Sequence, residues 1–264
     1  MTKTDWRLFG EPFFSEVVRA VGDALSEEGL QLLLTLVRTD DERRRLVEYV
    51  RGGRVDGVLL MSVRAGDVLP DMLADAGLPT VLLGRRSGDV RGHGQRRRRA
   101  SRSATWPAAG RKAIAAITGP PDMYVAQCRL RGYREELADA GLREVPSLVA
   151  EGDFTEASGL RAMGELIEGH PEVDAVFAAS DSMAAGALTA LLAAGRSVPE
   201  DVAVVGFDDF ELAEQTEPPL TTVRQPMEEI GRTMVRLLLE EMEEPEVAWR
   251  HVILRTRLMV RGSA

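Results

Sequence analysis

Cysteine, histidine and long apolar runs are scarce in this chain of 264 residues. The one cysteine, Cys128, excludes an internal disulfide, and the three histidines form no Cys/His spacing typical of zinc sites. We therefore predict no metal and no cofactor. No apolar run approaches the roughly 20 residues that a membrane-spanning helix needs, and residues 1–10 lack the apolar segment of a secretory signal. These absences predict a cytoplasmic protein without a membrane partner.

An excess of positive charge is also missing. The formal net charge is −9, with 42 Asp and Glu residues against 33 Lys and Arg residues. A protein that grips DNA with its own surface needs a basic face to neutralise the phosphates, so the charge argues against that mode of binding. The sequence also contains no P-loop, no GxSxG and no GxGxxG motif. We predict neither direct DNA binding by this chain nor enzyme activity.

What the chain does have is a regular alternation of helical and strand patterns. Stretches with apolar residues at a period of 3.6 alternate with short apolar runs, as in a doubly wound α/β sheet. The expected helices cover residues 12–29, 40–51, 67–76, 127–140, 155–168, 181–195 and 228–243. The expected strands cover residues 30–37, 55–61, 79–83, 112–118, 147–150, 173–178 and 202–205, and two short stretches within 252–260.

The order of these elements predicts an α/β protein of two lobes, each a doubly wound parallel sheet. The first lobe comprises residues 1–92 and 226–250, and the second comprises residues 93–225 and 251–264. The chain then crosses between the lobes three times. A cleft between two such lobes is expected to close by hinge motion around a small ligand. No DNA-binding domain is recognised ahead of the first lobe.

The stretch from Val176 to Pro226 carries the most information about function. Its first strand is followed by Ser180 and Asp181, an N-cap pair for the next helix, and its second strand ends in Asp208 and Asp209. Two strands joined by one helix form a parallel βαβ unit, and ligands bind beyond the carboxyl ends of parallel strands. Ser180 and Asp208 are therefore expected side by side at a ligand-binding edge.

The same stretch resembles the signature of the LacI/GalR family of bacterial transcription regulators, with ASDSMAAGAL followed by VPEDVAVVGFDDFELAEQTEPPLTTVRQP. Further similar segments occur in the expected order: EPFFSEVV at 11–18, VDGVLL at 55–60, GRKAIAAITGP at 110–120, RLRGYREEL at 129–137 and EGDFTEASG at 151–159. Each segment alone is a weak signal. Together they cover most of residues 8–263 and are specific.

The resemblance implies the periplasmic binding protein-like type I fold and a role as the effector-sensing part of a LacI-type repressor. It implies a sugar or sugar-like effector, a homodimer, and operator DNA bound through a helix-turn-helix domain that this chain does not show. By position in the family's motifs, the ligand-binding residues are Phe13, Phe14, Arg129, Phe154, Ser180, Asp208 and Gln225. Ser180 departs from the family's usual Asn, which leaves the hydroxyl group that it would recognise unassigned.

Several of these residues also have a purely structural interpretation. Arg129 can pair with Glu135 or Glu136 on an exposed helix face, and Phe154 can simply pack in the core. The two phenylalanines of the EPFF segment can anchor the start of a helix.

The neighbouring carboxylates leave further alternatives open. Asp208 and Asp209 can form a general acid/base pair, because adjacent carboxylates push their pKa values apart. Asp181 is expected to cap the helix that follows it. For the whole chain, two other functions stay open: a stand-alone periplasmic-type sugar-binding protein, and a truncated or frameshifted remnant without function.

Residues 86–109 break the pattern, since the helix expected there has no apolar face. The run Arg96–Arg99 permits three interpretations: a nucleic-acid contact, a solvated loop, or a segment read in the wrong frame. Codon degeneracy allows Gly92–Pro107 to be encoded so that a shift of one nucleotide reads AMDNAGGARAVRQLGR, which is similar to the family's motif at this place. We hypothesise that two compensating frameshifts bracket this segment. Independent sequencing of the gene that finds no such alternative frame would exclude the hypothesis.

Overall fold

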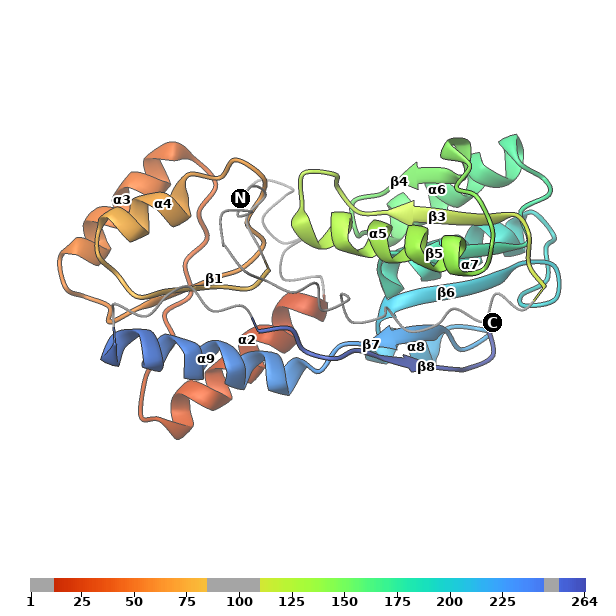
Figure 1. Cartoon of the computed structure of the whole chain (residues 1–264). Coiled ribbons are helices and arrows are strands. Elements are labelled where there is room, and N and C mark those ends of the chain that lie inside the picture. The colour runs from red at the N-terminus through yellow and green to blue at the C-terminus, as the bar shows by residue number, and fades with distance from the viewer. Residues whose placement is uncertain (1–11, 85–109, 245–251) are drawn as a thin grey trace. The chain divides into compact units, whose positions relative to one another are not determined.

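The computed structural model describes residues 12–84, 110–244 and 252–264 (Figure 1). The chain divides into two compact units: unit 1, Met1–Gly92 with Pro226–Leu254, and unit 2, His93–Gln225 with Arg255–Ala264. In this division the last boundary follows Leu254, whose side chain packs against a core cluster of unit 1, and the sequence predicted it after residue 250. The segment 86–109 lies outside the described residues, and its three interpretations stay open.

Unit 2 is built, within the described residues, on a six-stranded sheet with the order β4-β3-β5-β6-β7-β8. Its strands are β3 Ile114–Thr118, β4 Val149–Glu151, β5 Ala175–Ala178, β6 Ala203–Asp208, β7 Thr221–Arg224 and β8 Arg257–Met259. All neighbouring strands pair in parallel except β8, which is antiparallel to β7. Nearly every residue of β3, β5 and β6 is buried, as expected for parallel strands covered by helices on both faces.

Close helix packing fixes the loops on one side of this sheet. The helices of unit 2 are α5 Tyr124–Asp139, α6 Glu156–Gly169, α7 Asp181–Ala193 and the short α8 Glu211–Gln215, with a 3-10 turn at Pro146–Leu148. Helices α6 and α7 touch backbone to backbone: a Cβ added to Gly159 would lie 2.1 Å from the Met183 carbonyl oxygen. One loop joins β4 to α6 and another joins β5 to α7. The contact between α6 and α7 therefore holds both loops in place.

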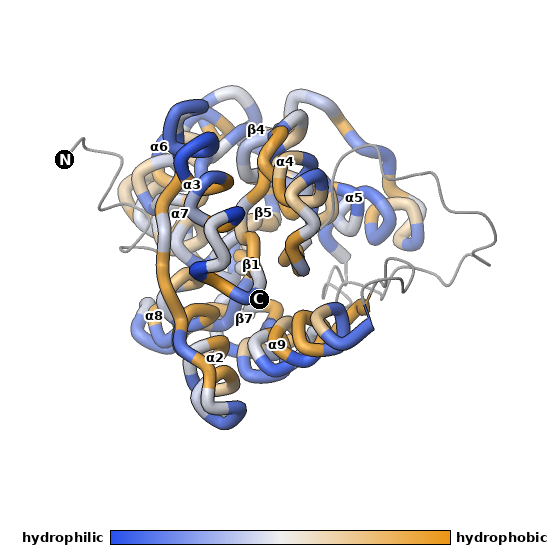
Figure 2. The backbone as a smooth tube through the Cα atoms, turned by 90° about the vertical axis from the view of Figure 1, so that its left-hand side faces the viewer, coloured by the Kyte–Doolittle hydropathy of each residue, from blue (hydrophilic) through white to orange (hydrophobic). Residues whose placement is uncertain are grey.

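Unit 1 packs helices on both faces of a short parallel sheet. Its elements are α2 Pro12–Glu27, α3 Asp40–Arg51, β1 Val58–Leu60, α4 Leu69–Asp75, β2 Thr80–Leu82 and α9 Met227–Glu243. Leu59 packs with residues of α2 and α9, whereas Leu60 packs with residues of α3 and α4, because successive strand residues point to opposite faces. Helix α9 shows hydrophobic and hydrophilic residues mixed along its length (Figure 2), as an amphipathic helix should.

The strand expected at residues 30–37 is absent from the structure. This stretch forms neither helix nor strand, and Leu32, Leu33 and Leu34 are 40%, 60% and 45% exposed. A strand needs a hydrogen-bonded neighbour, and in the described part of the chain β1 pairs with β2 alone. The expectation was wrong because an apolar run indicates β propensity but not the presence of a partner edge. For the same reason the tail 252–260 forms one strand, β8, where two were expected.

Candidate ligand-binding site

The carboxyl ends of the parallel strands in unit 2 bring polar and aromatic side chains together. Asp208 ends β6, Gln225 follows β7, Ser180 follows β5 and Phe154 lies in the loop after β4. Arg129 reaches the same edge from α5. The predicted site residues of unit 2 therefore lie at one edge of the sheet, where parallel α/β proteins bind their ligands.

A buried ion pair forms the centre of this cluster. One terminal nitrogen of Arg129 lies 2.9 Å from Asp208 Oδ1, and both side chains are 7% exposed. The other terminal nitrogen of Arg129 donates to the backbone carbonyl of Ala179. This pairing contradicts the interpretation of Arg129 as an exposed helix residue that pairs with its neighbours Glu135 or Glu136.

The ion pair leaves hydrogen-bonding capacity unused. Gln225 Nε2 donates to the same oxygen, Asp208 Oδ1, at 2.6 Å. Both of these contacts use Oδ1 of Asp208. Arg129 Nε is buried and has no acceptor among the described residues. A buried donor without an acceptor is costly, so this arrangement suits a site that a ligand oxygen completes.

Two aromatic rings enclose the guanidinium group of Arg129. Its central carbon lies 4.0 Å from the ring centroid of Phe207 and 5.7 Å from that of Phe154, both within cation–π range. Phe154 has a backbone φ of +69°, which is rare for a bulky residue, and its ring fills the space where Gly119 has no side chain. Such strain is concentrated at ligand-binding sites. Sequence reasoning missed Phe207, because it looked like an ordinary buried strand residue.

The predicted N-cap pair of α7 is confirmed for Ser180 and wrong for Asp181. Ser180, not Asp181, is the N-cap, and its hydroxyl accepts from the backbone N–H of Met183 at 3.2 Å. Asp181 instead binds groups from other elements, since it accepts from the Phe210 N–H at 3.1 Å and from the Thr222 hydroxyl. The local pattern could not distinguish these roles, because either side chain can cap a helix.

Two buried carboxylates carry raised pKa values at this edge. Burial raises the pKa of Asp181 to about 7, and the nearby charge of Asp208 contributes to the rise. Burial raises the pKa of Asp208 to about 6, opposed first by the Arg129 charge and then by hydrogen bonds from Gln225 and Arg129. A ligand hydroxyl that donates to Asp208 would favour its charged form.

The acid/base interpretation of Asp208 and Asp209 loses its support. The Asp209 carboxylate does not share a partner with Asp208, because it accepts from Arg224 and Arg261 instead. The two adjacent carboxylates thus have separate surroundings. Asp208 is held by residues of the candidate ligand site, and Asp209 by a second polar network.

Phe13 and Phe14 belong to unit 1 and lie in the first turn of α2. Their rings meet edge to face with centroids 5.7 Å apart, and Phe13 packs against a core cluster of that unit. This packing agrees with their structural interpretation as a helix anchor. Their contact with a ligand stays a prediction.

Metal sites and membrane-spanning helices are both absent from residues 12–84, 110–244 and 252–264. No group of three or more His, Cys, Asp or Glu side chains in these ranges could hold a metal ion. None of the helices there is both long and apolar enough to cross a membrane.

Known proteins are similar to this chain over most of its length. A family model described as a periplasmic binding protein-like domain matches residues 107–264. The HTH-type transcriptional regulator CelR of Thermobifida fusca is 46% identical over 272 residues, which cover 100% of this chain and 79% of CelR. The HTH-type transcriptional repressor CytR of Escherichia coli K12 is 31% identical, with 96% of this chain and 76% of CytR covered.

A solved structure agrees with these relatives. It is described as a complex of the transcriptional regulator CelR with cellobiose, and it is 45% identical to this chain with a TM-score of 0.88. The comparison covers 100% of this chain and 83% of that structure. The similarity thus extends over both units.

Proposed function

The chain belongs to the LacI family of transcriptional regulators, and on that basis we propose that its effector is a β-linked glucose disaccharide of the cellobiose type. The chain is the sugar-sensing domain of a LacI-type repressor, and its relatives are transcriptional regulators. The alternative of a stand-alone periplasmic-type binding protein finds no support among these relatives.

The observation that carries the proposal is the half-satisfied Arg129–Asp208 pair. Asp208 Oδ2 can accept a hydrogen bond from a sugar hydroxyl, and Arg129 Nε can donate to a sugar oxygen. The ring of Phe154 beside them offers a face to the apolar side of a pyranose. The relative solved with cellobiose makes a disaccharide the first effector to test.

We expect cellobiose, but neither maltose nor ribose, to raise the melting temperature of the chain. A ligand at a hundred times its dissociation constant stabilises the fold by about 2.7 kcal/mol, which differential scanning fluorimetry detects readily. Titration calorimetry then gives the affinity. A rise in melting temperature with ribose but not with cellobiose would reject a disaccharide as the effector.

Asp208→Asn tests the site within the same assay. It removes the charge that faces Arg129 and should abolish the shift. The matched control is Asp174→Asn, because the Asp174 carboxylate accepts from the backbone N–H groups of Lys112 and Ala113 ahead of β3. An unchanged shift with Asp208→Asn would remove Asp208 from the site.

The assembly and the location of the chain are further proposals. We infer that it acts as a homodimer in the cytoplasm and reaches operator DNA through a helix-turn-helix domain of the kind that the relatives' names state. The relatives are longer than this chain, which covers 79% of CelR. Sedimentation at micromolar concentration tests the dimer, and a monomer under those conditions would reject it.

A further inference from the structure

Two consecutive aspartates at the candidate site have an unusual backbone. Asp208 has a φ of +117° and Asp209 a φ of +61°, values that residues with a side chain rarely adopt. Such a conformation persists only where surrounding contacts hold it. The direction of the Asp208 carboxylate depends on this turn, so the contacts that hold the turn bear on ligand binding.

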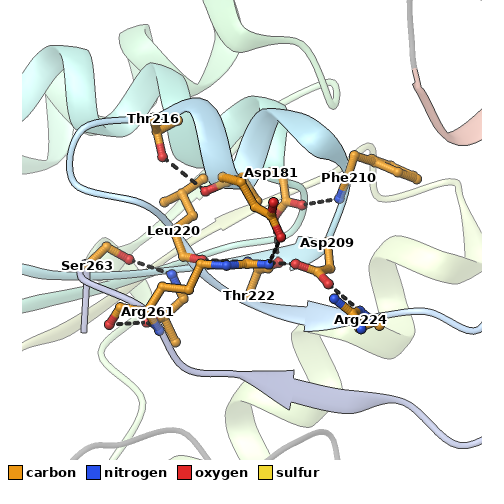
Figure 3. A network of polar contacts seen from close by, with 12 residues as sticks. Asp181, Asp209, Phe210, Thr216, Leu220, Thr222, Arg224, Arg261 and Ser263 are labelled. Carbon is orange, nitrogen blue, oxygen red and sulfur yellow. Dashed lines mark hydrogen bonds and ion pairs between the residues drawn. The ribbon is translucent and has the colours of Figure 1, made fainter.

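The Asp209 side chain is one of these contacts. It is 1% exposed and lies between two guanidinium groups (Figure 3). Arg261 donates to Asp209 Oδ1 at 2.6 Å, and Arg224 donates to Oδ2. Arg224 is 49% exposed whereas Arg261 is 15% exposed, so the Arg261 bond is the better shielded from water.

Arg261 links the turn to two other segments. Its guanidinium group also donates to the Leu220 carbonyl at 3.0 Å, just ahead of β7, and to Glu214 on α8 at 2.9 Å. The planar fork of an arginine can serve several acceptors at once, which a lysine ammonium cannot do in the same geometry. The single side chain thus joins the turn, α8 and the start of β7.

The segment that carries Arg261 is itself anchored in unit 2. The Arg261 N–H donates to the Thr221 hydroxyl at 2.9 Å. The buried Ser263 hydroxyl donates to the Val204 carbonyl at 2.6 Å and accepts from the Thr221 N–H at 2.8 Å. Ser263 therefore bridges β6 and β7 where their direct pairing begins, and Arg261 starts from a fixed position.

We propose that Arg261 is a positioning residue of the effector site, which it serves without touching the ligand. Through Asp209 it holds the strained turn, and the turn holds the Asp208 carboxylate towards Arg129 and Gln225. Without Arg261, the buried Asp209 keeps only a half-exposed partner, and the turn relaxes towards ordinary negative φ values. The inference rests on the proposed function, since it concerns the same site.

The test compares two arginines that both bind backbone carbonyls. Arg261→Gln and the milder Arg261→Lys are measured against Arg111→Lys, since Arg111 donates to the carbonyls of Pro199, Glu200 and Asp201, outside the turn. Affinity for cellobiose is measured by calorimetry at a temperature where each variant is folded. We expect at least a tenfold weaker affinity for Arg261→Gln, a smaller loss for Arg261→Lys, and less than a twofold change for Arg111→Lys.

Two further measurements separate positioning from general stability. When Asp209→Asn is already present, adding Arg261→Gln should cause little additional loss of cellobiose affinity, because both substitutions break the ion pair between Arg261 and Asp209. Hydrogen exchange at the amides of Asp209 and Phe210 should be faster in Arg261→Gln than in Arg111→Lys, and the Phe210 amide is the one that donates to Asp181. Unchanged affinity and unchanged exchange in a folded Arg261→Gln variant would overturn the inference.

The outcomes also distinguish this inference from the proposed function. If the unaltered chain binds no cellobiose, or if Asp208→Asn binds it normally, the proposed effector site is rejected. The exchange rates at Asp209 and Phe210 then still decide whether Arg261 holds the turn. If Asp208→Asn abolishes binding and Arg261→Gln does not weaken it, the site stands and the positioning role fails.

Discussion

The Arg129→Met variant is expected to bind cellobiose about a hundredfold more weakly than the unaltered chain, as truncation of one partner of a buried charge pair implies. It should also lose about 3–5 kcal/mol of folding free energy at pH 8, because Asp208 then carries a buried charge without its cation. Methionine keeps an apolar stem similar to that of arginine and removes the charge and the guanidinium group, and the pH dependence then separates the electrostatic part from the packing.

The stability loss should depend on pH in a defined direction. Burial raises the pKa of Asp208 to about 6 in the folded chain, above the ordinary value near 4 of an unfolded aspartate. A raised pKa means that the folded state holds the proton longer, so stability from this group falls as the pH rises through the folded pKa. Arg129 lowers the pKa of Asp208. Removal of Arg129 therefore raises this pKa further, and the folding free energy continues to decrease above pH 6. Thermal unfolding at pH 5 and pH 8 measures the difference.

A double variant provides the control. Arg129→Met with Asp208→Asn has no unpaired charge and should regain most of the stability at pH 8, while cellobiose binding stays lost. An equal loss of stability at pH 5 and pH 8 in the single variant would contradict the electrostatic explanation. It would assign the loss to the packing of the guanidinium between Phe154 and Phe207.

The same substitution at two glycines of α6 should have opposite effects on stability. A Cβ at Gly159 would lie 2.1 Å from the Met183 carbonyl oxygen and 2.6 Å from its Cα, which are backbone atoms of α7. The helices must separate to admit it, so Gly159→Ala is expected to cost about 2 kcal/mol. Separation would also move the loops that carry Phe154 and Ser180, and cellobiose binding should weaken.

Gly164 is the matched control on the same helix. A Cβ there meets no atom within 4 Å, so Gly164→Ala gains helix propensity without a clash. We expect a stabilisation of about 0.5–1 kcal/mol. Chemical denaturation monitored by circular dichroism compares the two variants, and a Gly159→Ala variant as stable as Gly164→Ala would show that α6 and α7 do not touch so closely.

Local patterns predicted most of the secondary structure because helix and strand periodicity are properties of adjacent residues. The helix at Asp40–Arg51 begins and ends where the sequence indicated, with Thr39 and Glu42 forming a capping box. The prediction of a strand at residues 30–37 was wrong because strand formation depends on a partner edge, and the local sequence does not indicate whether one is present. The expectation that Asp181 caps α7 was wrong for a similar reason, since the partners of Asp181 come from other elements.

The sequence by itself determined the α/β class, the family resemblance and the positions of Arg129, Phe154, Asp208 and Gln225 within its motifs. Only the tertiary structure decided what these side chains touch. Arg129 contacts Asp208, which is 79 residues away in the sequence, and Arg261 contacts Asp209, which is 52 residues away. These contacts form because the order of strands in the sheet brings the elements to one edge. Residues so far apart share no periodicity, and their contact follows from the pairing of whole strands.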